Sequence, residues 1–325
     1  MLPRPLITST FGLQYRRIPI LAIGRHIYCD TSLIIEALEH FFPADQGWGT
    51  VYPEAQGLGV GEWKYRAMAR GFAGFWTDKP LFRTTTGFIP PSVWSSDFGK
   101  DRAQLIGHPI QPEKLQAKIP DNLSLLDMHL SMLEPMFTSG TWAMPTQTPS
   151  LADLSLYYQL RWGMDIGAGR GIGDLSGGGA RDTDGEEDVV GLVFNAERYP
   201  GLMRWFERFE EYIDGLPDTQ VTVKKGDVQW KEALRRTPLL KDEELLVPTA
   251  VAPHETLDTR RGMVPGVGVS VVPDDTGRGN PTKGTLVKIG SEEVVIKPDE
   301  KAELDIRIHF PRLGFIVKVA KGSRL

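Results

Sequence analysis

The order of apolar and polar positions divides the chain into three regions with different periods. In the first, two short β-rich runs, Tyr15–Ile23 and Ile27–Cys29, flank the turn residues Gly24-Arg25-His26 and predict a hairpin. Asp30 and Thr31 are good helix-capping residues, and apolar residues then recur at helical spacing until a proline ends the pattern. This region predicts a strand, a turn, a strand and a helix.

The second region is mostly helical, because its apolar residues recur at intervals of three and four. The clearest helical segments are 60–76, 120–137, 150–162 and 200–213. Between the last two lies 163–188, which is rich in Gly and Asp and poor in large apolar side chains. Such a segment buries too little surface to hold one conformation, so we expect a flexible insertion there.

The third region follows a linker around 246–255 and changes to strand periodicity. Its β-rich runs are 267–271, 284–289, 293–296, 303–308 and 315–319, separated by Gly, Pro and Asp. We therefore expect a small β module over 257–325 that folds independently. The predicted boundaries are 1–45 for the hairpin domain, 46–245 for the helical domain and 257–325 for the β module.

Composition narrows the class of protein. The chain has 325 residues, more than one compact domain usually needs, with 41% hydrophobic and 24% charged residues. Its net charge of −5 disfavours nucleic acid and anionic membranes as partners. No apolar stretch is long enough to span a bilayer, and the single cysteine, Cys29, is typical of a reducing compartment, so we expect a cytoplasmic protein. The six histidines are too scattered to predict a metal site.

Two segments at the predicted hairpin resemble the glutathione-binding domain of the glutathione transferases, which has a thioredoxin-like fold: Tyr15-Arg16-Arg17-Ile18-Pro19 and Cys29-Asp30-Thr31. The resemblance implies a cis Ile18-Pro19 bond that lets the Ile18 backbone pair with the cysteinyl part of glutathione. It also implies that Thr31, at the helix N-terminus, holds the γ-glutamyl carboxylate while Asp30 faces the ammonium group. By themselves Asp30 and Thr31 fit a helix cap, but together with Ile18-Pro19 they favour the family fold.

Further segments resemble the helical domain of the same family. Pro149–Leu154 is similar to the segment that opens a central helix there, and Ser150 with Asp153 predicts a reciprocal capping box. Tyr199–Phe206 is similar to a later helix of that domain, which a proline opens. A branch of transferase-like proteins common in fungi is most similar in the order of four segments: Leu2-Pro3-Arg4-Pro5, Tyr15-Arg16-Arg17-Ile18-Pro19, Tyr28-Cys29-Asp30-Thr31 and the C-terminal β-rich region.

One part of the family pattern has no counterpart in this sequence. The resemblance places the activating Tyr, Ser or Cys at the end of a first strand, in a segment that precedes the hairpin. Ser9, Thr10 and Tyr15 are only weak substitutes, so the catalytic residue stays unassigned. We expect the native chain to extend upstream of Met1. The alternative is a truncated form that a partner completes or that is not catalytic.

We therefore predict an α+β multidomain protein with a partial thioredoxin-like domain, an all-α domain of glutathione-transferase type and a small all-β C-terminal domain. The implied function is glutathione-dependent conjugation or thiol chemistry on an electrophilic small molecule. Glutathione is the expected co-substrate, and Ile18, Pro19, Asp30 and Thr31 are its expected binding residues. A homodimer is left open as an alternative to a monomer. The alternative function is a non-catalytic interaction or scaffold protein of the same fold.

Overall fold

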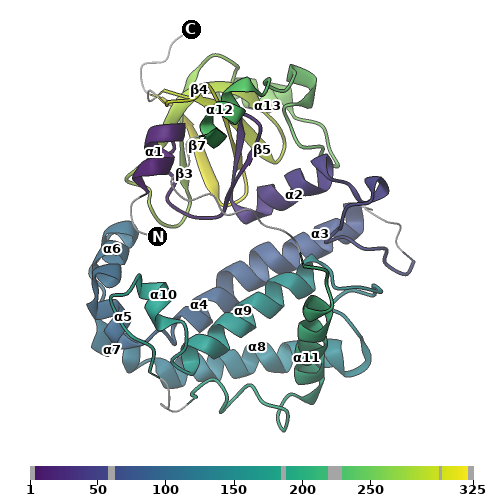
Figure 1. Cartoon of the computed structure of the whole chain (residues 1–325), viewed down its shortest axis with the longest axis vertical. Helices are drawn as coiled ribbons and strands as arrows, with labels where there is room; N and C mark the ends of the chain where they lie inside the picture. Colours follow the sequence, from purple (N-terminus) through teal and green to yellow (C-terminus); the bar gives the residue numbers. More distant parts are fainter. Residues whose placement is uncertain (1–3, 58–62, 184–187, 219–228, 300–301, 321–325) are drawn as a thin grey trace. The chain divides into compact units, whose positions relative to one another are not determined.

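The computed structural model describes residues 4–57, 63–183, 188–218, 229–299 and 302–320. The chain divides into two compact units, which are described separately here (Figure 1). Unit 1 is drawn from Met1–Gly49, Leu105–Gly107 and Val221–Leu325, and unit 2 from Thr50–Gln104 and His108–Gln220. One unit is built on a sheet and the other on helices, which agrees with the predicted α+β multidomain class.

Unit 1 is organised around one seven-stranded sheet of order β1-β2-β6-β5-β4-β3-β7. Its strands are β1 (Ile20–Ile23), β2 (His26–Cys29), β3 (Gly268–Pro273), β4 (Thr282–Ile289), β5 (Glu293–Pro298), β6 (Arg307–Pro311) and β7 (Phe315–Val319). All neighbouring strands are antiparallel except β2 and β6, which are parallel. The predicted hairpin and all five predicted C-terminal strands are present, although β1 and β6 start later than expected.

Helices pack against both faces of this sheet. The helical segments of unit 1 are α1 (Pro5–Phe11), α2 (Thr31–Phe41), η1 (Ala44–Gln46), α12 (Gln229–Arg236), η3 (Asp242–Glu244) and α13 (Glu255–Arg260). On one face, Leu33 and Ile34 of α2 form a buried cluster with Tyr28 of β2. On the other face, Phe11 of α1 packs in the larger core, with its ring 6.1 Å from that of Trp230 on α12.

The expectation of an independent module over 257–325, separate from a domain over 1–45, is wrong. The parallel pairing of β2 with β6 joins His26 to Arg307 and Tyr28 to His309, so the hairpin and the C-terminal strands share one sheet. They also share one core, in which Ile27 and Ile308 are fully buried. A two-stranded hairpin cannot cover its own apolar faces. The C-terminal strands provide that cover, and the boundary predicted from the linker therefore does not separate two folding units.

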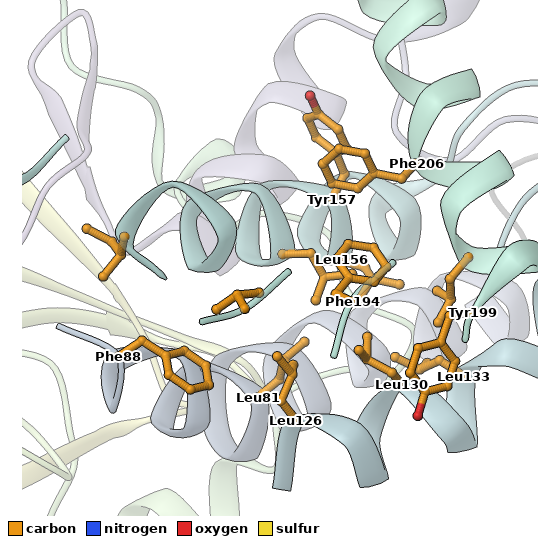
Figure 2. Close-up of a cluster of buried hydrophobic side chains, with 14 of the residues drawn as sticks. Leu81, Phe88, Leu126, Leu130, Leu133, Leu156, Tyr157, Phe194, Tyr199 and Phe206 are labelled. Carbon is orange, nitrogen blue, oxygen red and sulfur yellow. The ribbon is translucent and has the colours of Figure 1, made fainter. Parts of the chain in front are cut away.

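Unit 2 is helical, as predicted for most of the middle of the chain. Its elements are α3 (Trp63–Gly71), the π-helical η2 (Phe72–Leu81), α4 (Phe82–Thr86), α5 (Pro91–Ser95), α6 (Asp97–Ile106), α7 (Pro112–Gln116), α8 (Ile119–Ser139), α9 (Leu151–Gly167), α10 (Ile172–Ser176) and α11 (Pro200–Asp214). Figure 2 shows its core, where side chains of α8, such as Leu130, lie near Leu156 of α9 and Phe206 of α11. Within the part of the chain that the structure describes, no helix could cross a membrane.

The predicted capping box opens α9, and its carboxylate also serves as a buried hub of unit 2. Asp153 is fully buried, and its Oδ2 accepts from the Ser150 N–H at 2.9 Å and from the Ser150 hydroxyl at 2.8 Å. The other oxygen, Oδ1, accepts from the Ala143 N–H at 2.6 Å and from the Trp205 indole N–H at 2.9 Å. One side chain therefore joins the start of α9, the preceding loop and α11.

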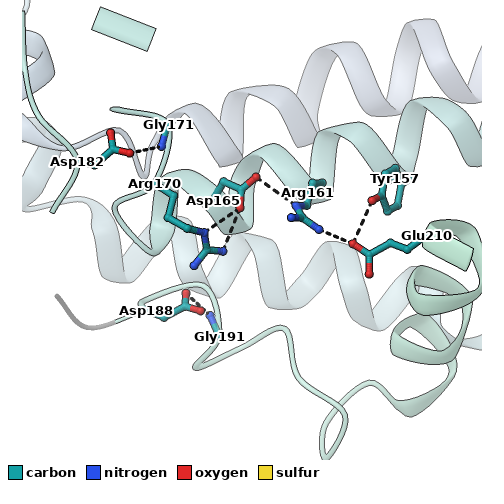
Figure 3. Close-up of polar contacts among 9 residues, drawn as sticks. All are labelled: Tyr157, Arg161, Asp165, Arg170, Gly171, Asp182, Asp188, Gly191 and Glu210. Carbon is teal, nitrogen blue, oxygen red and sulfur yellow. Dashed lines mark hydrogen bonds and ion pairs between the residues drawn. The ribbon is translucent and has the colours of Figure 1, made fainter. Parts of the chain in front are cut away.

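Residues 163–183, where we expect a flexible insertion, contain helix and turn in the structure, and their flexibility stays a prediction. The first five of these residues complete α9, and α10 follows after a short turn. Figure 3 shows the polar contacts that hold this turn. Asp182 accepts hydrogen bonds from the Gly171 N–H at 3.1 Å and the Gly173 N–H at 2.8 Å, and Arg170 pairs with Asp165 at 3.0 Å. Polar contacts thus add to the apolar packing of this segment, in which Ile166 and Ile172 are buried in the core of unit 2. Residues 184–187 of the predicted insertion lie outside the described residues.

Candidate functional site

The strand register of the hairpin brings the two predicted binding motifs together. Ile20 pairs with Cys29 at the open end of the hairpin. Continuing this register outward by one residue places Pro19 beside Asp30, at the start of α2. The Ile18-Pro19 peptide bond is cis, as predicted. Residues that are separated by eleven positions in the sequence therefore meet at one end of the sheet.

The Ile18 side of this site faces solvent. β1 is the first strand in the order of the sheet, so one edge of it has no neighbour among the described strands. The Ile18 residue is 54% exposed, and its backbone makes no hydrogen bond to any other described residue. An open strand edge next to exposed backbone N–H and C=O groups is the arrangement that an extended peptide uses to bind.

Asp30 and Thr31 form the helical side of the site. Asp30 is the N-cap of α2, and its Oδ1 accepts from the Ser32 N–H at 3.1 Å and the Ser32 hydroxyl at 2.6 Å. Its backbone has a φ of 73°, the one positive value at a non-glycine residue in the described structure. Non-glycine residues in such conformations cost about 1–3 kcal/mol and occur often at ligand sites. Thr31 is the first helical residue and is exposed.

The structure therefore gives Asp30 a capping role, which the sequence alone also allowed. Its second oxygen, Oδ2, accepts from the Tyr15 hydroxyl at 3.4 Å. Each carboxylate oxygen has two lone pairs, so these contacts leave capacity for a further donor such as an ammonium group. The Thr31 hydroxyl makes no hydrogen bond with the described residues and is available to a ligand.

Cys29 is a core residue rather than a reactive thiol. It is fully buried at the end of β2. Burial, and after it the nearby charge of Asp30, raises the pKa of the Cys29 thiol well above its usual value. The thiolate is the reactive form of cysteine, so this side chain is inert at neutral pH.

The three hydroxyl residues considered as substitutes for the activating group are poorly placed for that role. Tyr15 is buried against Phe310 and Phe315, and burial, followed by the charge of Asp30, raises the pKa of its hydroxyl. Thr10 is fully buried, and the Ser9 hydroxyl donates to the Leu6 carbonyl of its own helix at 3.3 Å. Tyr15 and Thr10 are buried and the Ser9 hydroxyl is bonded within α1, so the structure does not identify any of the three as the activating group.

Sequence reasoning missed one polar cluster in this unit. His26, Glu293 and His309 are distant in the sequence, yet hydrogen bonds join them in the interior of the sheet. Only the strand order brings them together, so their spacing in the sequence gave no sign of it. Among the described residues, no group of three or more His, Cys, Asp or Glu side chains could hold a metal ion.

Comparisons with known proteins relate this architecture to the glutathione transferase fold. A family model described as a domain of unknown function, DUF7962, matches residues 87–170. A GST-like protein from Pseudomonas syringae aligns over 98% of this chain and 87% of its own, with 20% identity and a TM-score of 0.57. The β-etherase LigF from Sphingobium sp. strain SYK-6 aligns over 58% of this chain and 74% of its own, with 17% identity and a TM-score of 0.37. No curated protein matches the chain.

Proposed function

We propose that this chain is a glutathione transferase-like protein that binds glutathione at the open end of the β1–β2 hairpin. The fold is of that type, as the similarity to the Pseudomonas syringae protein shows. The observation that carries the proposal is the meeting of Ile18-Pro19 with Asp30-Thr31 at one end of the sheet. The fungal branch, the cytoplasmic location and the homodimer remain predictions from the sequence.

The geometry suggests how a γ-glutamyl tripeptide would bind. The exposed Ile18 backbone would pair with the cysteinyl residue. The Thr31 N–H and hydroxyl, with the positive end of the α2 dipole behind them, would hold the γ-glutamyl carboxylate. Asp30 would accept from the ammonium group next to that carboxylate. Each of these hydrogen bonds contributes about 1–3 kcal/mol when one partner is charged.

The proposal includes glutathione binding but not efficient conjugation of glutathione to an electrophile. Conjugation needs a group that stabilises the thiolate of glutathione, and Ser9, Thr10 and Tyr15 do not supply it. Loss of one such hydrogen bond costs about 2.7–4 kcal/mol at a transition state, by analogy with oxyanion-hole donors. We therefore expect the chain as written to bind glutathione with little turnover of an electrophilic substrate. A low turnover of this kind would also agree with the alternative of a non-catalytic binding protein.

Calorimetric titration of glutathione tests the proposal. Thr31→Ala removes the hydroxyl anchor and should weaken binding by about 10- to 100-fold, which corresponds to the loss of one charge-assisted hydrogen bond. Thr138→Ala is the matched control, because Thr138 is also exposed and its hydroxyl bonds only within α8, to the Glu134 carbonyl. S-methylglutathione should bind like glutathione, since the anchors do not involve the sulfur.

Two results would reject this assignment. Equal affinity in the Thr31→Ala and Thr138→Ala variants would show that Thr31 does not contribute to glutathione binding. No heat of binding at millimolar glutathione would reject the proposed function. A conjugation assay with a generic electrophile completes the test. Rapid turnover by the unextended chain would show that a sulfur-activating group exists within these residues.

A further inference from the structure

A continuous chain of hydrogen bonds runs through the interior of unit 1 across three adjacent strands. His26 Nδ1 of β2 lies 2.8 Å from His309 Nε2 of β6, and His309 Nδ1 lies 2.5 Å from Glu293 Oε1 of β5. These three residues are 1%, 0% and 2% exposed, so no substrate reaches them. Each end of this series of side chains accepts a hydrogen bond from a backbone amide. The Leu240 N–H donates to His26 Nε2 at 3.0 Å, and the Val247 N–H donates to Glu293 Oε2 at 2.8 Å.

Counting donors and acceptors assigns the protons in this chain. His26 Nε2 accepts from Leu240, so the single proton of a neutral His26 is on Nδ1 and is donated to His309 Nε2. His309 then carries its own proton on Nδ1 and donates it to the Glu293 carboxylate. This is the one arrangement that satisfies every contact with neutral imidazoles. It leaves no free acceptor on His26 for an additional proton.

The charged groups around His26 do not favour its protonation. Arg25 in the adjoining turn and Arg307 on β6 both lie close enough to disfavour a positive charge there. Each of these arginines also pairs with Asp305, at 3.4 Å and 3.0 Å. Burial, followed by His309 and these two arginines, lowers the pKa of His26 to about 3.

Two aromatic side chains, Tyr28 and His40, also lie near this series of hydrogen bonds. The Tyr28 ring stacks on His309, with centroids 4.3 Å apart. The buried Tyr28 hydroxyl makes no hydrogen bond with the described residues. His40, on α2, lies within electrostatic reach of Glu293. Glu293 hydrogen-bonds to His309 and not to His26, whose own partners are His309 and the Leu240 N–H.

We propose that the Glu293–His309–His26 chain is a proton-sensitive latch that holds the segment 240–247 against the sheet and releases it on acidification. A proton taken from solvent at His26 Nε2 would put two N–H donors, those of His26 and Leu240, against each other. The Leu240 anchor is then lost. This inference goes beyond the proposed function and does not depend on glutathione binding.

The released segment covers part of the core beside α2. Val247 is buried in the cluster formed by Tyr28, Leu33, Ile34 and Ala37. The same segment contains η3, and the Lys288 ammonium donates to the Asp242 carbonyl at its start. Opening of the segment would break both amide contacts and uncover the part of this cluster that Val247 covers. Acid would expose an apolar surface that is covered at neutral pH.

Hydrogen exchange followed by mass spectrometry at pH 7.5 and pH 5.0 tests the latch, with rates divided by the intrinsic rate at each pH. The unfolded-state pKa of histidine is about 6.5 and the folded value is lower, so protection is complete above 6.5 and is lost as the pH falls. For the segment 240–247 we expect protection to fall about 30-fold between these two pH values. Protection in β4 and in α9 should fall much less.

The variant His26→Gln separates this latch from general acid sensitivity. Glutamine can accept from the Leu240 N–H and cannot titrate, so the fall in protection over 240–247 should disappear. An equal fall in the variant, an equal fall in β4, or no fall in the unchanged protein would overturn the proposal. If the variant does not fold, an NMR titration that follows the imidazole carbon resonance of His26 in the unchanged protein provides the test. Titration of that resonance near pH 6.5 with segment 240–247 still protected would also overturn it.

Discussion

Replacement of Asp153 should destabilise the helical unit more than any change at an exposed carboxylate. Its two oxygens accept four hydrogen bonds, and the donors include the indole N–H of Trp205, which is fully buried. Burial raises the pKa of the Asp153 carboxyl, and the four hydrogen bonds partly offset that rise. The contribution of Asp153 to stability therefore comes from its hydrogen bonds rather than from its charge.

The expected magnitude follows from the donors that lose their partner. Asp153→Ala leaves at least two buried donors unsatisfied, the Trp205 indole and the Ser150 N–H, at about 1–3 kcal/mol each. We therefore expect a loss of about 4 kcal/mol in the free energy of unfolding. Asp153→Asn keeps one acceptor oxygen and places an NH₂ group against the remaining donors, so its loss should be smaller, about 2–3 kcal/mol.

Urea denaturation followed by tryptophan fluorescence and by circular dichroism measures this difference. Asp214→Ala is the control, because Asp214 is exposed at the end of α11 and should change stability by less than about 0.5 kcal/mol. A loss below about 1 kcal/mol for Asp153→Ala would refute the hydrogen-bond argument. A larger loss for Asn than for Ala would refute the ranking of the two variants.

Two further predictions concern packing and the shared sheet. Gly201→Ala should lower the melting temperature, with a cost of about 1–3 kcal/mol, because a Cβ atom there would lie 3.1 Å from backbone atoms of Phe137 and Thr138 on α8. An unchanged melting temperature would show that α8 and α11 separate easily. Removal of 257–325 should leave the helices of unit 2 folded but remove hydrogen-exchange protection from β2, which loses its partner β6. Full protection of β2 in that truncated protein would instead support the prediction that 257–325 is independent of the hairpin.

Local features were predictable from the sequence because neighbouring residues determine them. The hairpin, the cap at Asp30 and the Ser150–Asp153 box each depend on residues a few positions apart, and the structure contains all three. Strand pairing across the chain was not predictable in the same way. β2 and β6 are separated by about 280 residues, and their pairing leaves no periodic pattern in either strand.

Composition was also a poor guide to the secondary structure of one glycine-rich segment. The segment 163–183 has many glycines, and its composition predicted flexibility. The structure holds it with a carboxylate, Asp182, that accepts from two backbone amides, and with the Arg170–Asp165 pair. The proposed binding residues Ile18, Pro19, Asp30 and Thr31 come from a resemblance, and the hairpin register brings their two motifs to one end of the sheet.

Backbone amide resonances recorded during a glutathione titration test the proposed binding site. We expect the amides of Ile18 and Thr31 to shift together and saturate with one dissociation constant, because both would donate to the same tripeptide. Resonances of the other unit, such as those of α11, serve as the internal reference. Shifts confined to other residues, or no shift at Ile18 and Thr31 at saturating glutathione, would contradict the proposed site.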